Sequence, residues 1–581
     1  MQKINKYLVK TILFFLTIFS FNGFVHAINL DDERIDPFDQ IEDFESVVYV
    51  KIGNAVCTGA VINNRTILTA AHCLIEGEVA EIFVGDEIND DSIKIETTSF
   101  IKLPEDRRYS GFNGASYDLA IISLKEPLEN VTPLPLNNTL PSLSSEVFIS
   151  GFGLHGTGSV PDQEFDSKKR WGKNVLSIIS KESSIVGLST LSETPDQTIL
   201  GFFFDEDVSP LESSISLGDS GSPLLVKDGE SFSIIGVASW VTQSLDSLNR
   251  GYGASAGFAS IEQNFEWISL NNPLREVATT VDGKWSLNET WNDAHYPNNF
   301  TPSSENYNST SARYYSASIN NSINLSDAVE IDELSISVLG KLILNQGSSL
   351  SVLLNTNILK GEITNNGNFT SSALFINEGI YKNENTSSFL NQLEIEKGEL
   401  MNNGDITAAS INLKEGMVSG TGKFITNKFM SKGSISPGSQ TNPIGTLTFS
   451  SLLESKGDLL IDLNNNNESD FIKAGKFTID GTLTLNPLNT FYSGNSRFNI
   501  MNFDEIEGQT FTNLNVLKPN FGRLNQKVIY MDKGIDLMLL NPGYENLVEN
   551  ERARSIGRHI DSFTSLTLSL IHISEPTRRR G

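Results

Sequence analysis

Residues 217–224 read Leu-Gly-Asp-Ser-Gly-Ser-Pro-Leu, and this stretch decides how the first half of the chain is interpreted. Its central serine, Ser220, follows Gly218 and Asp219 and precedes Gly221, and glycine permits the tight turn that exposes such a residue. A serine hydroxyl is a poor nucleophile at neutral pH unless a neighbouring base takes its proton. The stretch therefore predicts a nucleophile only if the chain also supplies a base and a group that orients it.

Two segments closer to the N-terminus supply these groups. Residues 68–73 read LTAAHC and contain His72, and residues 117–124 read YDLAIISL and contain Asp118. Each motif alone has an ordinary interpretation, because a lone histidine is more often a core or surface residue and an aspartate often opens a strand. The three motifs together, in the order His, Asp, Ser at domain-scale spacing, predict a catalytic triad of His72, Asp118 and Ser220.

These motifs resemble those of the trypsin/chymotrypsin family of serine proteases. The resemblance covers most of residues 47–272 and extends to CTGAVI at 57–62, ISGFG at 149–153 and VASW at 237–240. It implies a serine endopeptidase that cleaves proteins or peptides and needs no cofactor. His72 would act first as base and then as acid, Asp118 would orient its ring, and the backbone N–H groups of Gly218 and Ser220 would form the oxyanion hole.

The same resemblance predicts the substrate pocket. Ser214, six residues before the nucleophile, would lie at the pocket base, and Ser239, Trp240 and Val241 would form the strand that pairs with substrate. An aspartate at the base would favour lysine or arginine, and Val241 replaces the usual glycine of the wall. We therefore expect cleavage after small or medium apolar residues.

Activation in this family often creates a new N-terminus whose ammonium pairs with the aspartate before the nucleophile, here Asp219. The chain offers cleavage after Arg34, which would make Ile35 the partner of Asp219, although the usual glycines are missing.

The two cysteines of the chain, Cys57 and Cys73, bracket the histidine strand. An even pair in an exported protein indicates a disulfide, and two buried free thiols are the alternative. The resemblance favours the disulfide. No metal site is expected, because the chain has no His-Glu-x-x-His run and no Cys/His cluster with the spacing of metal ligands.

The N-terminal residues have the pattern of an export signal. Three lysines precede an apolar run, and Val-His-Ala at 25–27 offers a cleavage site, so residues 1–27 are expected to be a signal peptide and residues 28–45 a pro-segment or linker. A membrane-spanning helix is the alternative, but the run is shorter than the roughly 20 residues that a bilayer requires. We expect a secreted or bacterial cell-surface protein that passes through the periplasm.

The composition is that of a globular protein, with 39% hydrophobic and 20% charged residues. The formal net charge of −28 argues against nucleic acid as a partner, since such binding needs basic patches. The oligomeric state is not predicted.

Short apolar runs bounded by turn residues, with a closing helix near residues 262–270, predict an antiparallel barrel or sandwich over residues 46–273. From residue 274 to 540 short apolar pulses recur at roughly solenoid spacing among Asn, Ser, Thr and Gly, which favours a stack of short strands over Asn-rich disorder. The expected fold class is all-β: the trypsin/chymotrypsin resemblance implies a double antiparallel β-barrel, and the resemblance of the second half, given next, implies a parallel β-helix (solenoid) stalk after it.

The second half also resembles the passenger of bacterial autotransporters, in its tryptophans at 285 and 291 and in GTGKF at 420–424. That resemblance implies display or release through an outer-membrane barrel. Residues 541–567 would be a linker toward a barrel missing from this sequence, and residues 568–581 resemble a read-through of a sequencing adapter. A surface adhesin with an inactive protease-like domain is the competing interpretation.

Overall fold

The computed structural model describes residues 28–32, 44–103, 117–162, 165–181, 198–206, 208–243, 250–299, 314–508, 510–518, 521–543 and 551–564. The expected signal peptide and the expected artefact at 568–581 lie outside these ranges. The chain forms two compact units, with the boundary between Arg275 and Glu276. None of the helices in the described ranges is both long and apolar enough to span a membrane.

The first unit contains two barrel-like antiparallel sheets of seven strands each. One sheet has the order β6-β5-β2-β3-β4-β8-β7, with bounds β2 (Val47–Ile52), β3 (Ala55–Asn63), β4 (Thr66–Thr69), β5 (Ala80–Phe83), β6 (Lys94–Ile95), β7 (Thr97–Lys102) and β8 (Ala120–Leu124). The other has the order β11-β9-β15-β16-β17-β13-β12, with bounds β9 (Glu146–Gly151), β11 (Arg170–Val175), β12 (Ile178–Lys181), β13 (Thr198–Phe203), β15 (Pro223–Asp228), β16 (Ser231–Val241) and β17 (Ser255–Ser260).

Among the residues that the structure describes, three hydrophobic cores hold this unit together. One fills the first sheet around Val50 and Ile122, and another fills the second sheet around Ile149 and Phe258. The third combines side chains of both sheets and of the closing helix α2 (Ile261–Asn271), whose Ile268 is fully buried. Burying one such side chain contributes about 1.5–3 kcal/mol, so this shared core fixes the two sheets against each other.

A small third sheet contains β1 (Ile28–Leu30), β10 (His155–Thr157) and β14 (Ser213–Ser214), in the order β10-β1-β14. All three residues of β1 are buried. The segment 28–45 was expected to be a pro-segment or linker, but its first residues are an integral strand of this unit. Its sequence, Ile-Asn-Leu, is too short to show a period, which is why the pattern did not reveal it.

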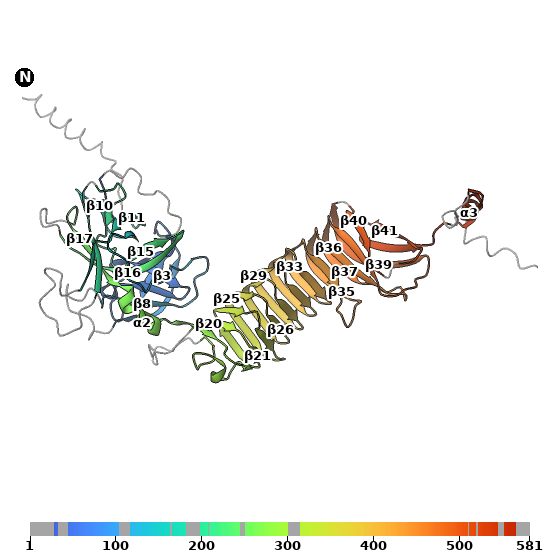
Figure 1. Ribbon diagram of the computed structural model, residues 1–581, viewed down its shortest axis with the longest axis horizontal. Helices are drawn as coiled ribbons and strands as arrows, with labels where there is room; N and C mark the ends of the chain where they lie inside the picture. The colour runs from blue at the N-terminus through green and yellow to red at the C-terminus, as the bar shows by residue number, and fades with distance from the viewer. Residues whose placement is uncertain are drawn as a thin grey trace, which may run out of the picture. The chain divides into compact units, whose positions relative to one another are not determined.

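The second unit is built from two stacks of mainly parallel strands, as Figure 1 shows from β20 to β39. One stack contains β18 (Leu274–Ala278), β20 (Tyr314–Ile319), β22 (Ala328–Ile331), β23 (Glu333–Ile336), β25 (Ser349–Ile358), β27 (Asn368–Ile376), β29 (Thr386–Ile395), β31 (Asp405–Leu413), β33 (Lys423–Ser431), β35 (Thr446–Ser455), β37 (Phe471–Ile479), β39 (Ser496–Gly508), β41 (Asn525–Met531) and β42 (Gly534–Leu540). The other contains β19 (Gly283–Lys284), β21 (Ser322–Leu325), β24 (Lys341–Leu344), β26 (Glu362–Asn365), β28 (Ile380–Asn383), β30 (Glu399–Asn402), β32 (Met417–Gly420), β34 (Ser434–Pro437), β36 (Asp458–Leu463), β38 (Thr482–Pro487) and β40 (Asn513–Val516).

Successive coils are in register. Glu362 pairs with Ile380, and Ile380 pairs with Glu399, so these two coils take 18 and 19 residues. Along most of these strands buried side chains alternate with half-buried or exposed ones; in β25, Leu350 and Val352 are buried. This arrangement, together with the barrels, confirms the predicted all-β class and is that of a β-helix.

Polar and small residues at the corners stabilise the coils. The side chains of Asn365, Asn383 and Asn402 are fully buried and form a ladder, with Nδ2–Oδ1 distances of 3.0 and 2.9 Å. A Cβ at Gly416 would lie 1.9 Å from the carbonyl oxygen of Gly398, so the corner admits only glycine there.

The two ends of the coil stack are closed differently. At the start the rings of Trp285 and Trp291 lie 4.9 Å apart, and both indole N–H groups donate to backbone carbonyls. At the other end β42 pairs antiparallel with β39 and with β41, which covers the last strand edge. Within 541–567, which was expected to be a linker, residues 551–564 form the helix α3 (Glu551–Thr564).

Candidate active site

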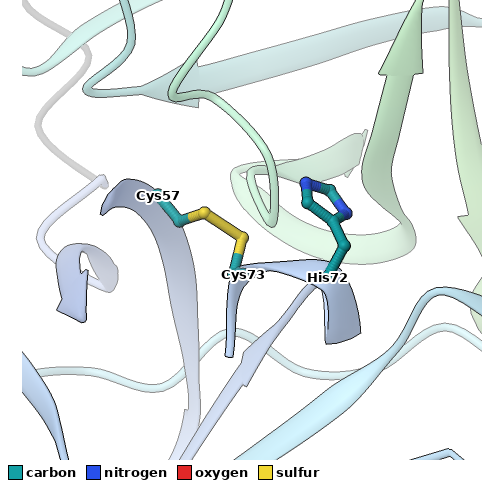
Figure 2. Close-up of side chains that lie close together, drawn as sticks. All are labelled: Cys57, His72 and Cys73. Carbon is teal, nitrogen blue, oxygen red and sulfur yellow. A yellow bond between two sulfur atoms is a disulfide. The ribbon is translucent and has the colours of Figure 1, made fainter. Parts of the chain in front are cut away.

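His72 lies on η1 (Ala71–Cys73), a single helical turn directly after β4. A disulfide joins Cys73, the next residue, to Cys57 on β3 (Figure 2). The predicted disulfide is therefore confirmed, and the alternative of two free thiols is wrong. Closing a loop of this length stabilises the fold by roughly 3 kcal/mol on the chain-entropy model, and it holds the turn that carries the imidazole against the first sheet.

The two sulfurs and a ring nitrogen of His72 lie within 4.8 Å of one another, a spacing that metal ligands can have. Cysteine binds metal as a thiolate, however, and both sulfurs are shared in the disulfide. Cys57 and Cys73 therefore form a structural disulfide beside the imidazole of His72, and not a metal centre with it.

Asp118 lies two residues before β8, the strand that pairs with β4, and reaches His72 with both carboxylate oxygens. Oδ1 accepts the backbone N–H of His72 at 2.9 Å, and Oδ2 lies 2.5 Å from Nδ1 of the ring. The hydroxyl of Ser239 on β16 donates to the same Oδ2 at 2.7 Å. Ser239 was predicted to pair with substrate; the structure gives its side chain the further task of fixing the carboxylate.

The carboxylate of Asp118 changes the pKa of the imidazole of His72. Burial by itself lowers the pKa of His72, but the hydrogen bond that its ring donates to Asp118 and the negative charge of Asp118 outweigh that effect and raise the pKa above its ordinary value of 6.5. A proton placed on Nε2 is therefore better tolerated than on an isolated histidine. This is the property that a general base needs while it holds a proton in transit.

Ser220 comes from the turn before β15, in the second sheet, and its Oγ lies 2.8 Å from Nε2 of His72. Gly221 after it has a φ of +88°, and a Cβ there would lie 2.1 Å from the carbonyl oxygen of Thr58. Only glycine fits this close approach, and the approach lets the N–H of Thr58 donate to the carbonyl of Ser220 at 2.9 Å. The structure thus brings together all three predicted triad residues.

The peptide group between Leu217 and Gly218 is held by the loop that connects β9 and β10. The N–H of Leu154 donates to the carbonyl of Leu217 at 2.6 Å. Because C=O and N–H point in opposite directions in a trans peptide, the N–H of Gly218 points away from Leu154. Gly218 itself has a φ of +98°, a conformation that favours glycine.

Thr58 is a residue of this site that the sequence did not reveal. Its side chain is fully buried, its hydroxyl donates to the carbonyl of Gly218 at 3.3 Å, and it accepts the N–H of Phe152 at 3.1 Å. It therefore links the turn of the nucleophile to β3 and to the loop after β9. Its position beside Cys57 in the CTGAVI motif was the available signal.

Asp219 is completely buried beneath this turn. Its Oδ1 accepts the N–H of Gly153 at 2.7 Å, and its Oδ2 accepts the N–H of Ser216 at 2.8 Å. Burial raises its pKa to about 7, against the opposing effect of these two hydrogen bonds. The carboxyl group thus ties the nucleophile's turn to the loop that contains Gly153.

The residues predicted to line the pocket lie on separate strands. Ser214 is fully buried in β14, where its neighbour on β1 is Asn29. Trp240 and Val241 lie near the end of β16, and Val241 pairs with Ala256 on β17. The predicted activation residue Ile35 lies outside the described residues.

Comparisons with known proteins agree with this geometry. The trypsin family model matches residues 39–268. A beta-fibrinogenase-like protein of Daboia siamensis is 25% identical over 203 residues, which cover 34% of this chain and 72% of that protein. A collagenase of Hypoderma lineatum is 25% identical over 232 residues, covering 38% of this chain and 76% of the collagenase. A serine protease of Anopheles gambiae is 24% identical over 224 residues, covering 37% and 72% of the two chains. This chain therefore carries a domain of the trypsin family, with distant relatives among serine proteases.

Proposed function

We propose that the first unit is an active serine endopeptidase with His72, Asp118 and Ser220 as its triad. The observation that carries the proposal is the continuous chain of short contacts. Ser220 Oγ lies 2.8 Å from His72 Nε2, and His72 Nδ1 lies 2.5 Å from Asp118 Oδ2. A base within hydrogen-bond reach of a hydroxyl, oriented in turn by a third group, is the arrangement that nucleophilic catalysis requires.

In this mechanism Ser220 Oγ attacks the substrate carbonyl while Nε2 of His72 takes its proton. Asp118 keeps the ring in the tautomer that presents an unprotonated Nε2 and stabilises the charged ring that follows. The backbone N–H groups of Gly218 and Ser220 receive the oxyanion, and His72 then passes its proton to the leaving amine. Water repeats the sequence on the acyl-enzyme and frees Ser220.

Proteins are the proposed substrates, since two of the relatives bear the names collagenase and beta-fibrinogenase-like. For the residue before the cleaved bond we propose a small or medium apolar side chain. Ser214 provides no negative charge for a basic side chain of the substrate. The branched side chain of Val241, which pairs with Ala256, would shorten the substrate pocket.

We further propose that the protein is exported and that the β-helix is an autotransporter-type passenger. The signal-like start of the sequence, the disulfide and the parallel coils support this route. Detecting the β-helix with an antibody on intact cells of the native source, or in their medium, tests it. Detection only inside the cells would contradict it.

Digestion of a peptide library tests the proposed activity and specificity together. The full chain is expected to cut after Ala, Val or Leu, and Ser220→Ala should reduce the rate by about 10⁶-fold, as removal of a triad nucleophile does elsewhere. Dominant cleavage after Lys or Arg would overturn the specificity. A folded, disulfide-bonded chain that cuts nothing would overturn the activity and favour the adhesin interpretation.

A further inference from the structure

Asp162 lies between β10 and β11 and has an unusual backbone conformation. Its φ is +55°, in the left-handed region that few residues other than glycine adopt. Aspartate tolerates this region when its side chain bonds to the nearby backbone, but here the carboxylate bonds to side chains that are distant in the sequence. Strained positions of this kind are common at functional sites, because the surrounding contacts must hold them there.

Side chains from three other segments meet at Asp162. Its Oδ1 accepts the hydroxyl of Ser216 and the side-chain amide of Asn29, the latter at 3.3 Å. Its Oδ2 accepts a guanidinium N–H of Arg250 at 3.1 Å. The side-chain oxygen of Asn29 in turn accepts the backbone N–H of Asp162 at 3.1 Å. One residue therefore connects β1, the turn that leads to Ser220 and the segment before β17.

These contacts are largely shielded from water. Asn29 is completely buried and Ser216 is 3% exposed, while 17% of the Asp162 side chain and 28% of the Arg250 side chain remain accessible. A hydrogen bond from a hydroxyl to a carboxylate is charge-assisted, and it is strengthened where water is scarce. The bond from Ser216 to Asp162 is therefore a stronger link than an ion pair on an open surface.

Ser216 is the residue through which this cluster reaches the nucleophile. Its N–H donates to Oδ2 of Asp219 at 2.8 Å, and its carbonyl accepts the N–H of Asp219 at 3.1 Å. Ser220 follows directly, and the N–H groups of Gly218 and Ser220 are those proposed to bind the oxyanion. Ser216 thus begins a compact turn of residues 216–220, and its hydroxyl joins that turn to the segment that contains Asp162.

We propose that Asp162 is a positioning residue of the peptidase: through the hydroxyl of Ser216, its carboxylate holds the turn of residues 216–220 where the oxyanion requires it. Arg250 and Asn29 hold Asp162 in turn, since each bonds to it from a different segment. Asp162 acts on the transition state, because the donors of an oxyanion hole stabilise charge only when they are fixed in advance. The inference rests on the proposed peptidase activity.

Replacing Asp162 by glycine removes the carboxylate without straining the backbone, because glycine readily adopts the φ of this position. We expect Asp162→Gly to lower kcat by at least about tenfold and to change KM by less than about threefold. Asp162→Asn keeps an oxygen that can accept the hydroxyl of Ser216, so its kcat should return to within about threefold of the wild type.

A control variant comes from a second acid that bonds to the same segment. The carboxylate of Asp32 accepts the N–H of Ser159 at 3.1 Å, and it has no printed role at the turn of residues 216–220. Asp32→Ala should therefore leave kcat unchanged. A loss of kcat in Asp32→Ala as large as that in Asp162→Gly would show a general loosening of the segment and would overturn the proposal.

A double-mutant cycle tests whether Asp162 acts through Ser216. Ser216→Ala alone should lower kcat by a factor similar to that of Asp162→Gly. Adding Asp162→Gly to it should cost less than about threefold more, because the shared contact is already gone. The proposal is wrong if the two effects multiply, if the loss appears in KM alone, or if Asp162→Gly keeps full kcat. Ser216→Ala leaves Asp162 bonded to Arg250 and Asn29, so its kcat provides the same test if Asp162→Gly does not fold.

A second readout needs no turnover, so it separates this inference from the proposed function. In the Ser220→Ala chain, hydrogen exchange of the peptide that contains residues 216–222 is followed by mass spectrometry. We expect this exchange to be at least about tenfold faster after Asp162→Gly and unchanged after Asp32→Ala. Equal exchange with and without the carboxylate of Asp162 would overturn its anchoring role. A wild-type chain that shows this protection but cuts nothing would instead refute the peptidase.

Discussion

The two units of this protein use β-structure in opposite ways. In the first, the proposed active site combines single residues from distant segments: His72 and Asp118 from the first sheet, and Ser220 from the second. In the second, stability comes from repetition, as in the ladder from Asn365 through Asn383 to Asn402. The comparison shows that the proposed active site lies where irregular turns interrupt the sheets. The β-helix is instead stabilised by contacts that repeat from coil to coil.

The largest effect that we expect to be confined to one unit follows from replacing the carboxylate of Asp118. Asp118→Asn should reduce kcat by about 10⁴-fold, because an amide no longer holds His72 in the required tautomer. Peptide hydrolysis measures the rate, and hydrogen exchange of the β-helix should be unchanged. A loss below tenfold would mean that Asp118 does not orient the base.

The opposite result, an effect confined to the β-helix, is expected for a substitution at the centre of the asparagine ladder. Asn383 donates to Asn402 and accepts from Asn365 and Ser387, so Asn383→Leu leaves several buried polar groups unsatisfied. We expect a loss of about 2–4 kcal/mol in local stability. Hydrogen exchange of β26, β28 and β30 measures it, and peptidase activity should be unchanged.

The exposed Asn466 provides the control for that substitution. Asn466→Ala should change stability by less than about 0.5 kcal/mol. Equal effects of the two substitutions would show that the ladder is not a stabilising element.

A smaller effect is expected at Thr58, where the regular strand β3 meets the irregular site. Thr58→Val keeps the shape but removes the hydroxyl that bonds Gly218 and Phe152. The loss of about one net hydrogen bond should reduce kcat by roughly tenfold. Steady-state kinetics check this, and a change confined to KM would argue against a link between Thr58 and the oxyanion hole.

The smallest effect concerns pH. The base must be unprotonated to accept the proton of Ser220, and the pKa of His72 is raised by Asp118. Activity should therefore fall as the pH drops, with the midpoint of the acid limb of kcat/KM above 6.5, the ordinary value. A midpoint below that value would show that burial, and not Asp118, dominates.

The same contrast explains what the sequence could predict. The motifs around His72, Asp118 and Ser220 indicated the barrels and the disulfide, because catalysis requires particular residue types in a fixed order. The apolar pulses of the second half indicated the β-helix, because every coil repeats the same burial. Thr58 and the strand at Ile28 escaped prediction, since the two hydrogen bonds of one side chain and three buried residues leave no repeating pattern in a sequence. The ladder of asparagines was not predicted either, because the burial of these polar side chains depends on how the coils stack.

The central claim is that the imidazole of His72 activates the hydroxyl of Ser220. Labelling with a fluorophosphonate probe, followed by peptide mapping, tests it most directly. We expect one adduct per chain, located on Ser220, with loss of peptidase activity in proportion and at least 100-fold slower labelling in His72→Ala. A folded and correctly processed chain that takes up no label, or that is labelled equally fast without His72, would contradict the claim.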